Sequence, residues 1–189
     1  MKKYIMPSLK LTLVLLIICA VIYPLLIAGI ARFAPGGGGG EKLMLNDRVV
    51  GYAHVGQKFT EDRYFWGRPS AVGYNAAGSG GSNKGPSNPD YLKTVRDRID
   101  SFLVHNPTVQ RGQVPSEMVT ASGSGLDPDI SPNSALIQVA RVAKARSLPA
   151  EKLRRLVQQY TETPWFGPAH VNVLKLNIGL ETLQQKYRT

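Results

Sequence analysis

The stretch LTLVLLIICAVIYPLLIAGIA, Leu11 to Ala31, decides how this chain is organised. It contains no charged residue and consists mostly of Leu, Ile and Val. At about 1.5 Å per residue, a helix of this length is roughly 31 Å long, which matches the hydrocarbon core of a bilayer. The stretch therefore predicts one membrane-spanning helix, with everything after Arg32 on one side of the membrane.

The charges that flank this stretch predict its orientation. Three lysines precede it (Lys2, Lys3 and Lys10), and only Arg32 follows it closely. The positive-inside rule keeps such an N-terminus in the cytoplasm and exports the rest of the chain. The alternative is a cleaved signal peptide with a small-residue site at Gly29-Ile30-Ala31, but the apolar core of a signal peptide has only about 7 to 15 residues. We therefore expect an uncleaved anchor.

The composition limits the possible partners and the redox chemistry. The 189 residues carry a formal charge of +10, and +7 remains once the three lysines before the span are left out. No dense Lys/Arg run and no nucleic-acid motif is present, so we expect no nucleic-acid partner. A basic face toward anionic headgroups or an acidic partner is the milder interpretation. The only cysteine, Cys19, lies in the span, so the exported part can form neither a disulfide nor a thiolate metal site.

These observations divide the chain into four segments. Residues 1–10 are the cytoplasmic N-terminus and residues 11–34 the transmembrane helix. Residues 35–41 include five consecutive glycines and are expected to form a flexible tether. Residues 42–189 are expected to form a single exported domain, because about 150 residues suffice for one compact domain and are too few for two.

The pattern within residues 42–189 predicts an α+β domain in which helices dominate. A strand is expected over Arg48–Val55, a packed irregular segment over Phe59–Tyr74 and a short strand over Val114–Thr120. Two polar loops rich in Gly and Ser, Ala76–Pro89 and Ala121–Ile130, complete the non-helical part.

Four helices are predicted from their caps and from apolar spacing. Asn88-Pro89 begins the first helix, Ser131-Pro132 the second and Pro149 the third, and the fourth follows Asn172. The Asn106-Pro107 pair ends the first helix. Apolar residues share one face of each helix. They are Leu92, Val95, Ile99, Phe102 and Leu103 in the first, Leu136, Val139 and Ala143 in the second, Leu153, Leu156, Val157 and Tyr160 (expected to face inward) in the third, and Val173, Leu176, Leu180, Leu183 and Tyr187 in the fourth.

No catalytic or metal site is expected. The Gly-rich run 78–85 is not a phosphate-binding P-loop, because Lys84 is not followed by Ser or Thr. The run 77–81, AGSGG, approaches the nucleophile elbow of hydrolases but lacks the adjacent helix and a His and acid partner. Asp127 and Asp129 lack the ligand count of a calcium loop, and no two histidines stand at metal-ligand spacing.

Several motifs carry a resemblance to a known family. They are YFWGRPS (64–70), YNA (74–76), SGGSN (79–83), GPSNP (85–89), VTASGSGLDP (119–128), ISP (130–132), QVARVA (138–143) and VNVLKLN (171–177). In this order and spacing they resemble the KdpC family of potassium-transporting ATPases, from the bacterial Kdp system. The resemblance covers nearly the whole chain, including the anchor. Lys84 and the five-glycine tether depart from the family pattern.

The resemblance implies a non-catalytic subunit of a high-affinity, ATP-driven potassium importer in the bacterial inner membrane. The implied partners are a channel-like potassium-binding A subunit, a P-type ATPase B subunit and a small single-span F peptide. It also implies a role in assembly and as a catalytic chaperone that raises the affinity of the ATPase subunit for ATP. The alternative is a free-standing membrane-anchored envelope enzyme or ligand-binding module.

Two kinds of site follow from the resemblance. Gln138 matches the family glutamine proposed to contact ATP, the one implied cofactor, although the charge argument places Gln138 outside the cytoplasm. We therefore prefer docking of the exported domain on the potassium-binding subunit near its ion entrance. The residues expected to dock come from the two polar loops and the turn before them: Tyr74, Asn75, Ser79, Gly80, Gly81, Ser82, Asn83, Ser122, Gly123, Ser124, Gly125 and Asp127.

Overall fold

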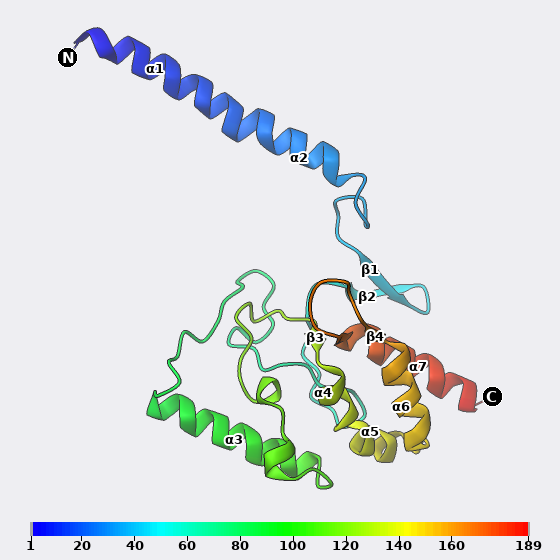
Figure 1. Cartoon of the computed structure of the whole chain (residues 1–189). Coiled ribbons are helices and arrows are strands. Elements are labelled where there is room, and N and C mark those ends of the chain that lie inside the picture. The colour runs from blue at the N-terminus through cyan, green and yellow to red at the C-terminus, as the bar shows by residue number, and fades with distance from the viewer. Residues whose placement is uncertain (1, 189) are drawn as a thin grey trace. The chain divides into compact units, whose positions relative to one another are not determined.

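The first of two compact units is dominated by one long apolar helix. The computed structural model describes residues 2–188, and the two units divide between Lys42 and Leu43. The helix comprises α1 (Lys2–Ile17), a π-helical turn (Ile18–Ile22) and α2 (Tyr23–Ala31), as Figure 1 shows. The segment Lys3–Ala31 is 29 residues long and strongly apolar, and none of its most apolar stretch is buried within the protein, so it is a candidate membrane span.

The π-helical turn has an identifiable cause in Pro24, the second residue of α2. A proline ring carries no N–H and clashes with the carbonyl four residues earlier, here that of Ala20. A single wider turn before the proline accommodates the clash without ending the helix.

Consecutive turns follow the apolar helix. The Gly37 N–H donates to the Ala34 carbonyl (2.9 Å), and the Gly39 N–H donates to the Gly36 carbonyl (3.0 Å). Gly36, Gly37 and Gly38 all have positive φ angles, which glycine adopts at no steric cost.

The second unit begins with a β-hairpin of β1 (Lys42–Leu45) and β2 (Arg48–Tyr52). Both residues of its two-residue turn, Asn46 and Asp47, have positive φ angles, as a type I′ hairpin turn requires. The predicted strand over Arg48–Val55 is therefore present but ends three residues early. After Tyr52 the chain turns, and the Ala53 carbonyl accepts a hydrogen bond from Asn172 Nδ2 (2.7 Å) instead of a strand partner.

A small antiparallel sheet ties distant parts of the second unit together. Its strands are β3 (Asp129–Ile130), β4 (Thr161–Glu162) and β5 (His170–Asn172), with β5 in the centre. Ile130 and Thr161 both lie opposite Val171, one on each side. Val171 and Ile130 are buried, so this register brings the segment after the second polar loop into the core.

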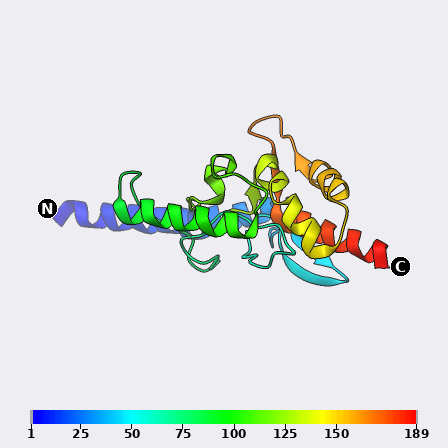
Figure 2. The ribbon, with the colours of Figure 1, turned by 90° about the horizontal axis from the view of Figure 1, so that it is seen from below.

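Five α-helices accompany this sheet. They are α3 (Pro89–His105), α4 (Pro132–Leu136), α5 (Val139–Arg146), α6 (Ala150–Gln159) and α7 (Val173–Arg188). In Figures 1 and 2, α4 to α7 gather around the sheet, whereas α3 lies apart from them toward the opposite end of the unit. The buried core includes Phe65, Ile130, Val139, Val142, Leu153, Val157, Val171, Leu176 and Leu180.

Both predicted side-chain caps are confirmed. Asn88 Oδ1 accepts from the Tyr91 N–H (3.0 Å) and Ser131 Oγ from the Ser134 N–H (3.2 Å). These bonds satisfy backbone donors that the first turn of a helix leaves free.

Two local predictions are wrong. The segment Val114–Thr120 is not a strand; Pro115 lacks an N–H for a ladder, and Ser116–Met118 forms a 3₁₀ turn instead. The second predicted helix is broken at Ile137 and Gln138 into α4 and α5.

The apolar face of α3 is only partly covered. Only Phe102 is buried, Val95, Ile99 and Leu103 are half-buried, and Leu92 is 42% exposed. Tyr187 near the end of α7 is likewise exposed. The spacing identifies an amphipathic helix correctly, but spacing alone does not show whether another element packs against the apolar face.

Candidate functional site

The two polar loops meet in space. The Gly80 N–H and the Ser79 hydroxyl both donate to the Ser124 carbonyl, and both donor–acceptor distances are 2.9 Å. These bonds join segments 45 residues apart in the chain. The exposed parts of residues 75–83 and 122–125 therefore form one continuous surface, here called the Gly/Ser platform.

The platform is supported from below by the YFWGRPS segment. Ser70 Oγ donates to the Gly125 carbonyl (2.6 Å), and the Ser122 N–H donates to the Pro69 carbonyl (3.0 Å). Arg68 forms an ion pair with Asp127 (Nη1–Oδ2, 2.9 Å). Side-chain and backbone bonds of this kind fix a loop that its composition alone would leave flexible.

The structure separates the predicted docking residues into three groups. Asn75, Ser79, Ser82, Asn83, Gly123 and Ser124 are exposed; Tyr74, Gly80, Gly81 and Asp127 are half-buried; Ser122 and Gly125 are buried. Gly125 has a positive φ, and a Cβ there would lie 2.6 Å from Val72 and 2.7 Å from the Gly80 carbonyl oxygen. The last two residues thus shape the platform, and the exposed ones form the surface open to a partner.

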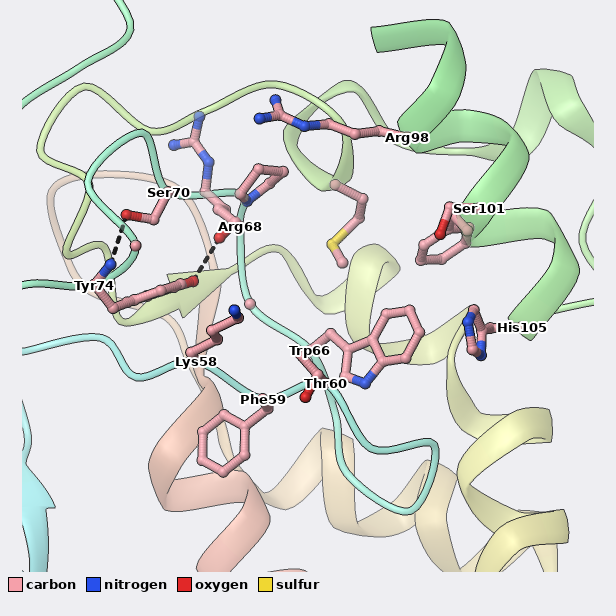
Figure 3. Close-up of a pocket in the computed structure, with 15 residues that line it drawn as sticks. Lys58, Phe59, Thr60, Trp66, Arg68, Ser70, Tyr74, Arg98, Ser101 and His105 are labelled. Atoms are coloured by element: carbon pink, nitrogen blue, oxygen red, sulfur yellow. Dashed lines mark hydrogen bonds between the residues drawn. The ribbon is translucent and has the colours of Figure 1, made fainter. Parts of the chain in front are cut away.

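Tyr74 is also a support rather than an exposed contact. Its hydroxyl donates to the Arg68 carbonyl, and its own N–H donates to Ser70 Oγ (2.9 Å), both drawn in Figure 3. Burial, with a smaller contribution from the Asp127 carboxylate, raises the pKa of Tyr74 to about 12. Tyr74 therefore stays a neutral hydrogen-bond donor at physiological pH.

A cavity of about 400 Å³ opens beside this support. Figure 3 shows Lys58, Arg68 and Arg98 at its walls, with Trp66 and Phe59 offering aromatic surface. Among the described residues that line the cavity, none is acidic. The lining therefore combines aromatic surface with basic side chains, of which Arg68 is already paired with Asp127.

Gln138 is not at this surface. Its side chain is 0% exposed, and its amide brackets the backbone of Trp66: Oε1 accepts from the Trp66 N–H (2.8 Å) and Nε2 donates to the Trp66 carbonyl (3.2 Å). Oε1 also accepts from Arg141 Nη2 (2.6 Å), and Nε2 donates to the Ser134 carbonyl (2.9 Å). In this conformation every polar atom of the side chain is bonded inside the protein.

Two further residues, Arg141 and Asn177, also bond buried backbone of the segment that contains Trp66, and neither was predicted from the sequence. The guanidinium of Arg141 donates to the carbonyls of Asp62 (2.7 Å) and Tyr64 (2.9 Å) and stacks 4.0 Å from the Trp66 ring centre. Its side chain is 3% exposed, and burial lowers its pKa to about 10. Asn177 brackets the backbone of Phe65 in the same way (2.9 and 3.0 Å). The available signal was the spacing of Gln138 and Arg141, which puts them on one face of a helix.

In the part of the chain that the structure describes, Ser79, His105 and His170 each have a partner other than one another. The Ser79 hydroxyl donates to a backbone carbonyl rather than to a histidine, while His105 pairs with Asp62 (2.7 Å) and His170 with Glu162 (3.7 Å). Within residues 2–188, no three His, Cys, Asp or Glu side chains gather as a metal site.

Comparisons with known proteins agree with one another. The family model "KdpC: K+-transporting ATPase, c chain" matches residues 5–182. A potassium-transporting ATPase KdpC subunit from Flavobacterium psychrophilum is 56% identical over 183 residues, covering 96% of this chain and 100% of the relative. Subunits of the same name from Bacteroides fragilis (53% over 190 residues; 97% and 100% covered) and Polaromonas naphthalenivorans (48% over 191 residues; 97% and 97%) are also similar.

Proposed function

The chain belongs to the KdpC family of potassium-transporting ATPase subunits, and from this premise we propose that its Gly/Ser platform is the surface that docks on a partner subunit. The chain is an accessory, non-catalytic subunit of the Kdp complex. The proposed partner is the potassium-binding A subunit near its ion entrance, in an assembly with the ATPase B subunit and the F peptide.

The observation that carries this proposal is the bonding of the two polar loops to one another. A docking surface must be exposed, yet ordered before binding, because ordering a loop on contact weakens association. The platform meets both conditions through the bonds to the Ser124 and Gly125 carbonyls. Its small residues let a partner backbone approach closely.

The proposed location is the bacterial inner membrane, with a single span, the N-terminus inside and the domain outside. Its support is the excess of lysines before the span. Because Cys19 is the only cysteine and lies in the span, a Gly112→Cys variant adds one reporter outside the span. A membrane-impermeant maleimide should label this variant in cells whose outer membrane has been made permeable. Labelling only after lysis of the inner membrane would reverse the orientation.

We propose that any effect of this subunit on the ATP affinity of the complex is transmitted through docking. The alternative is a direct ATP contact by Gln138. Docking is favoured because the amide of Gln138 is fully bonded inside the domain.

A substitution in open space on the platform tests the docking proposal. A Cβ at Gly123 meets no atom within 4 Å, and neither does one at Gly112, which is exposed but outside the platform. Gly123→Trp should weaken association with the Kdp subunits about 5- to 150-fold, because a misplaced side chain costs about 1 to 3 kcal/mol in a packed contact. Ser79→Trp should act in the same direction.

The matched control is Gly112→Trp, which should co-purify like the wild type. Thermal unfolding of the two glycine variants should agree with that of the wild-type chain. Normal assembly of Gly123→Trp, with potassium-stimulated ATPase activity intact, would show that the platform serves only the fold of the domain.

A further inference from the structure

Two adjacent aromatic side chains stand almost free of the second unit. Trp165 is 92% exposed and Phe166 is 82% exposed, in the loop between β4 and β5. Their ring centres are 4.9 Å apart, so they form one apolar tip. Exposed aromatic surface of this size is unfavourable in water and marks a contact site rather than a random surface position.

The loop that carries them is built to hold the tip outward. Residues 163–169, TPWFGPA, include no charged side chain. Pro164 and Pro168 restrict the backbone on both sides, and Gly167 takes a positive φ, which a residue with a Cβ would resist. The antiparallel pairing of β4 with β5 fixes the base of the loop.

The base of the loop adjoins the place where the chain enters the second unit. Asn172 at the end of β5 donates to the Ala53 carbonyl just after β2 (2.7 Å). In β4, the hydrogen bond from Lys175 and, more weakly, the nearby charge of His54 lower the pKa of Glu162. In Figure 1, the β1–β2 hairpin and the β4–β5 loop both lie toward the end at which the chain enters the unit, and Figure 2 shows them on opposite sides of it.

The span keeps this end of the unit within reach of lipid. Ten residues, 32–41, connect the end of the apolar helix to β1, and ten residues extend to at most about 33 to 36 Å. The connection therefore sets an upper limit of about 33 to 36 Å on the distance between the end of the span and β1, which allows the second unit to reach the headgroups.

We propose that Trp165 and Phe166 insert into the interface of the bilayer that holds the span. Aromatic rings are favoured at the depth of the headgroups, where an apolar body and a polar edge are both accommodated. An uncharged protruding tip suits a fluid apolar layer better than the flat surface of a protein partner. The positive charge of the chain adds attraction to anionic lipid. This contact is separate from the Gly/Ser platform.

Tryptophan fluorescence of the full chain tests the insertion. The chain has two tryptophans, so Trp66→Phe leaves Trp165 as the reporter. The variant is reconstituted in vesicles of phosphatidylethanolamine and phosphatidylglycerol, with or without phosphatidylcholine brominated on its acyl chains. Bromine should quench Trp165 and leave Trp66 unquenched in the matched Trp165→Phe variant. If Trp66→Phe does not fold, the difference between wild-type and Trp165→Phe emission gives the same quantity.

Emission of Trp165 that is equal in brominated and plain vesicles would overturn the proposal. Emission that shifts to the blue only when the other Kdp subunits are present, without bromine quenching, would assign the tip to a protein partner and would also overturn it. A loss of platform docking in Gly123→Trp should leave the quenching of Trp165 unchanged, so the two proposals fail separately.

Discussion

Replacing Gln138 with leucine should destabilise the second unit strongly, because the amide of Gln138 satisfies a buried stretch of backbone. Leucine is similar in size and suits a helix, so the substitution removes the polar atoms with little change of volume. The Trp66 N–H and carbonyl lose their partners, and Arg141 loses one of its acceptors.

The expected magnitude follows from these bonds. Leaving one buried donor unsatisfied costs about 1 to 3 kcal/mol, and a hydrogen bond to a charged group contributes about 1.5 to 3 kcal/mol. Arg141 keeps its bonds to Asn106 and to the carbonyls of Asp62 and Tyr64, so its loss is partial. A total of about 3 to 5 kcal/mol is a large share of the usual stability of a domain. It corresponds to a fall in melting temperature of about 6 to 20 °C.

The fall in melting temperature is measured by thermal unfolding of the detergent-purified chain, with circular dichroism used to monitor the transition of the second unit. Gln158→Leu is the control, because Gln158 is exposed on α6, and its melting temperature should stay close to that of the wild type. The reasoning is refuted if Gln138→Leu melts with the control. If Gln138→Leu melts with the control, and the ATP concentration for half-maximal Kdp activity rises in this variant, then Gln138 contacts nucleotide instead.

Two further predictions follow from the structure. Gly125→Ala should destabilise the chain by about 2 to 4 kcal/mol, because the positive φ of Gly125 and the nearby Val72 leave no room for a Cβ. Gly123→Ala is the control and should leave the melting temperature unchanged in the same thermal assay. Equal melting temperatures of the two variants would contradict the described platform. A hydrogen bond from Arg146, which outweighs burial, holds the pKa of Glu181 below its usual value of 4.5, so its stabilising effect is present above that pH and is lost as the pH falls through the lower, folded-state pKa. The difference in melting temperature between the wild type and Glu181→Gln should therefore shrink in acid, and a difference independent of pH would contradict this assignment.

The elements that can be predicted are those whose signals are local. The apolar length of the span, the cap at Asn88 and the proline after Ser131 each act within one or two turns of helix, and each appears in the structure. The polar loops are likewise recognisable as loops from their Gly and Ser content.

The elements that could not be predicted depend on distant partners. β3 and β4 have two residues each and exist only because β5 lies between them. The apolar face of α3 is partly exposed because no other element that the structure describes in the second unit covers Leu92. Arg141 reads in the sequence as a solvated charge, yet it is buried because a turn of backbone 77 residues earlier supplies carbonyl acceptors.

The contacts of Gln138 extend toward the platform through the YFWGRPS segment. Gln138 fixes Trp66, two residues later Arg68 pairs with Asp127, and Ser70 holds the Gly125 carbonyl. A substitution at Gln138 should therefore disturb the platform without any contact between the glutamine and a partner or a nucleotide. A change in ATP affinity in a Gln138 variant is evidence for nucleotide contact only if the platform is intact. Bringing Gly123→Trp, Gln138→Leu and the double variant through the same assembly assay decides this. If Gln138 acts only by supporting the platform, the defect of the double variant is smaller than the sum of the two single defects.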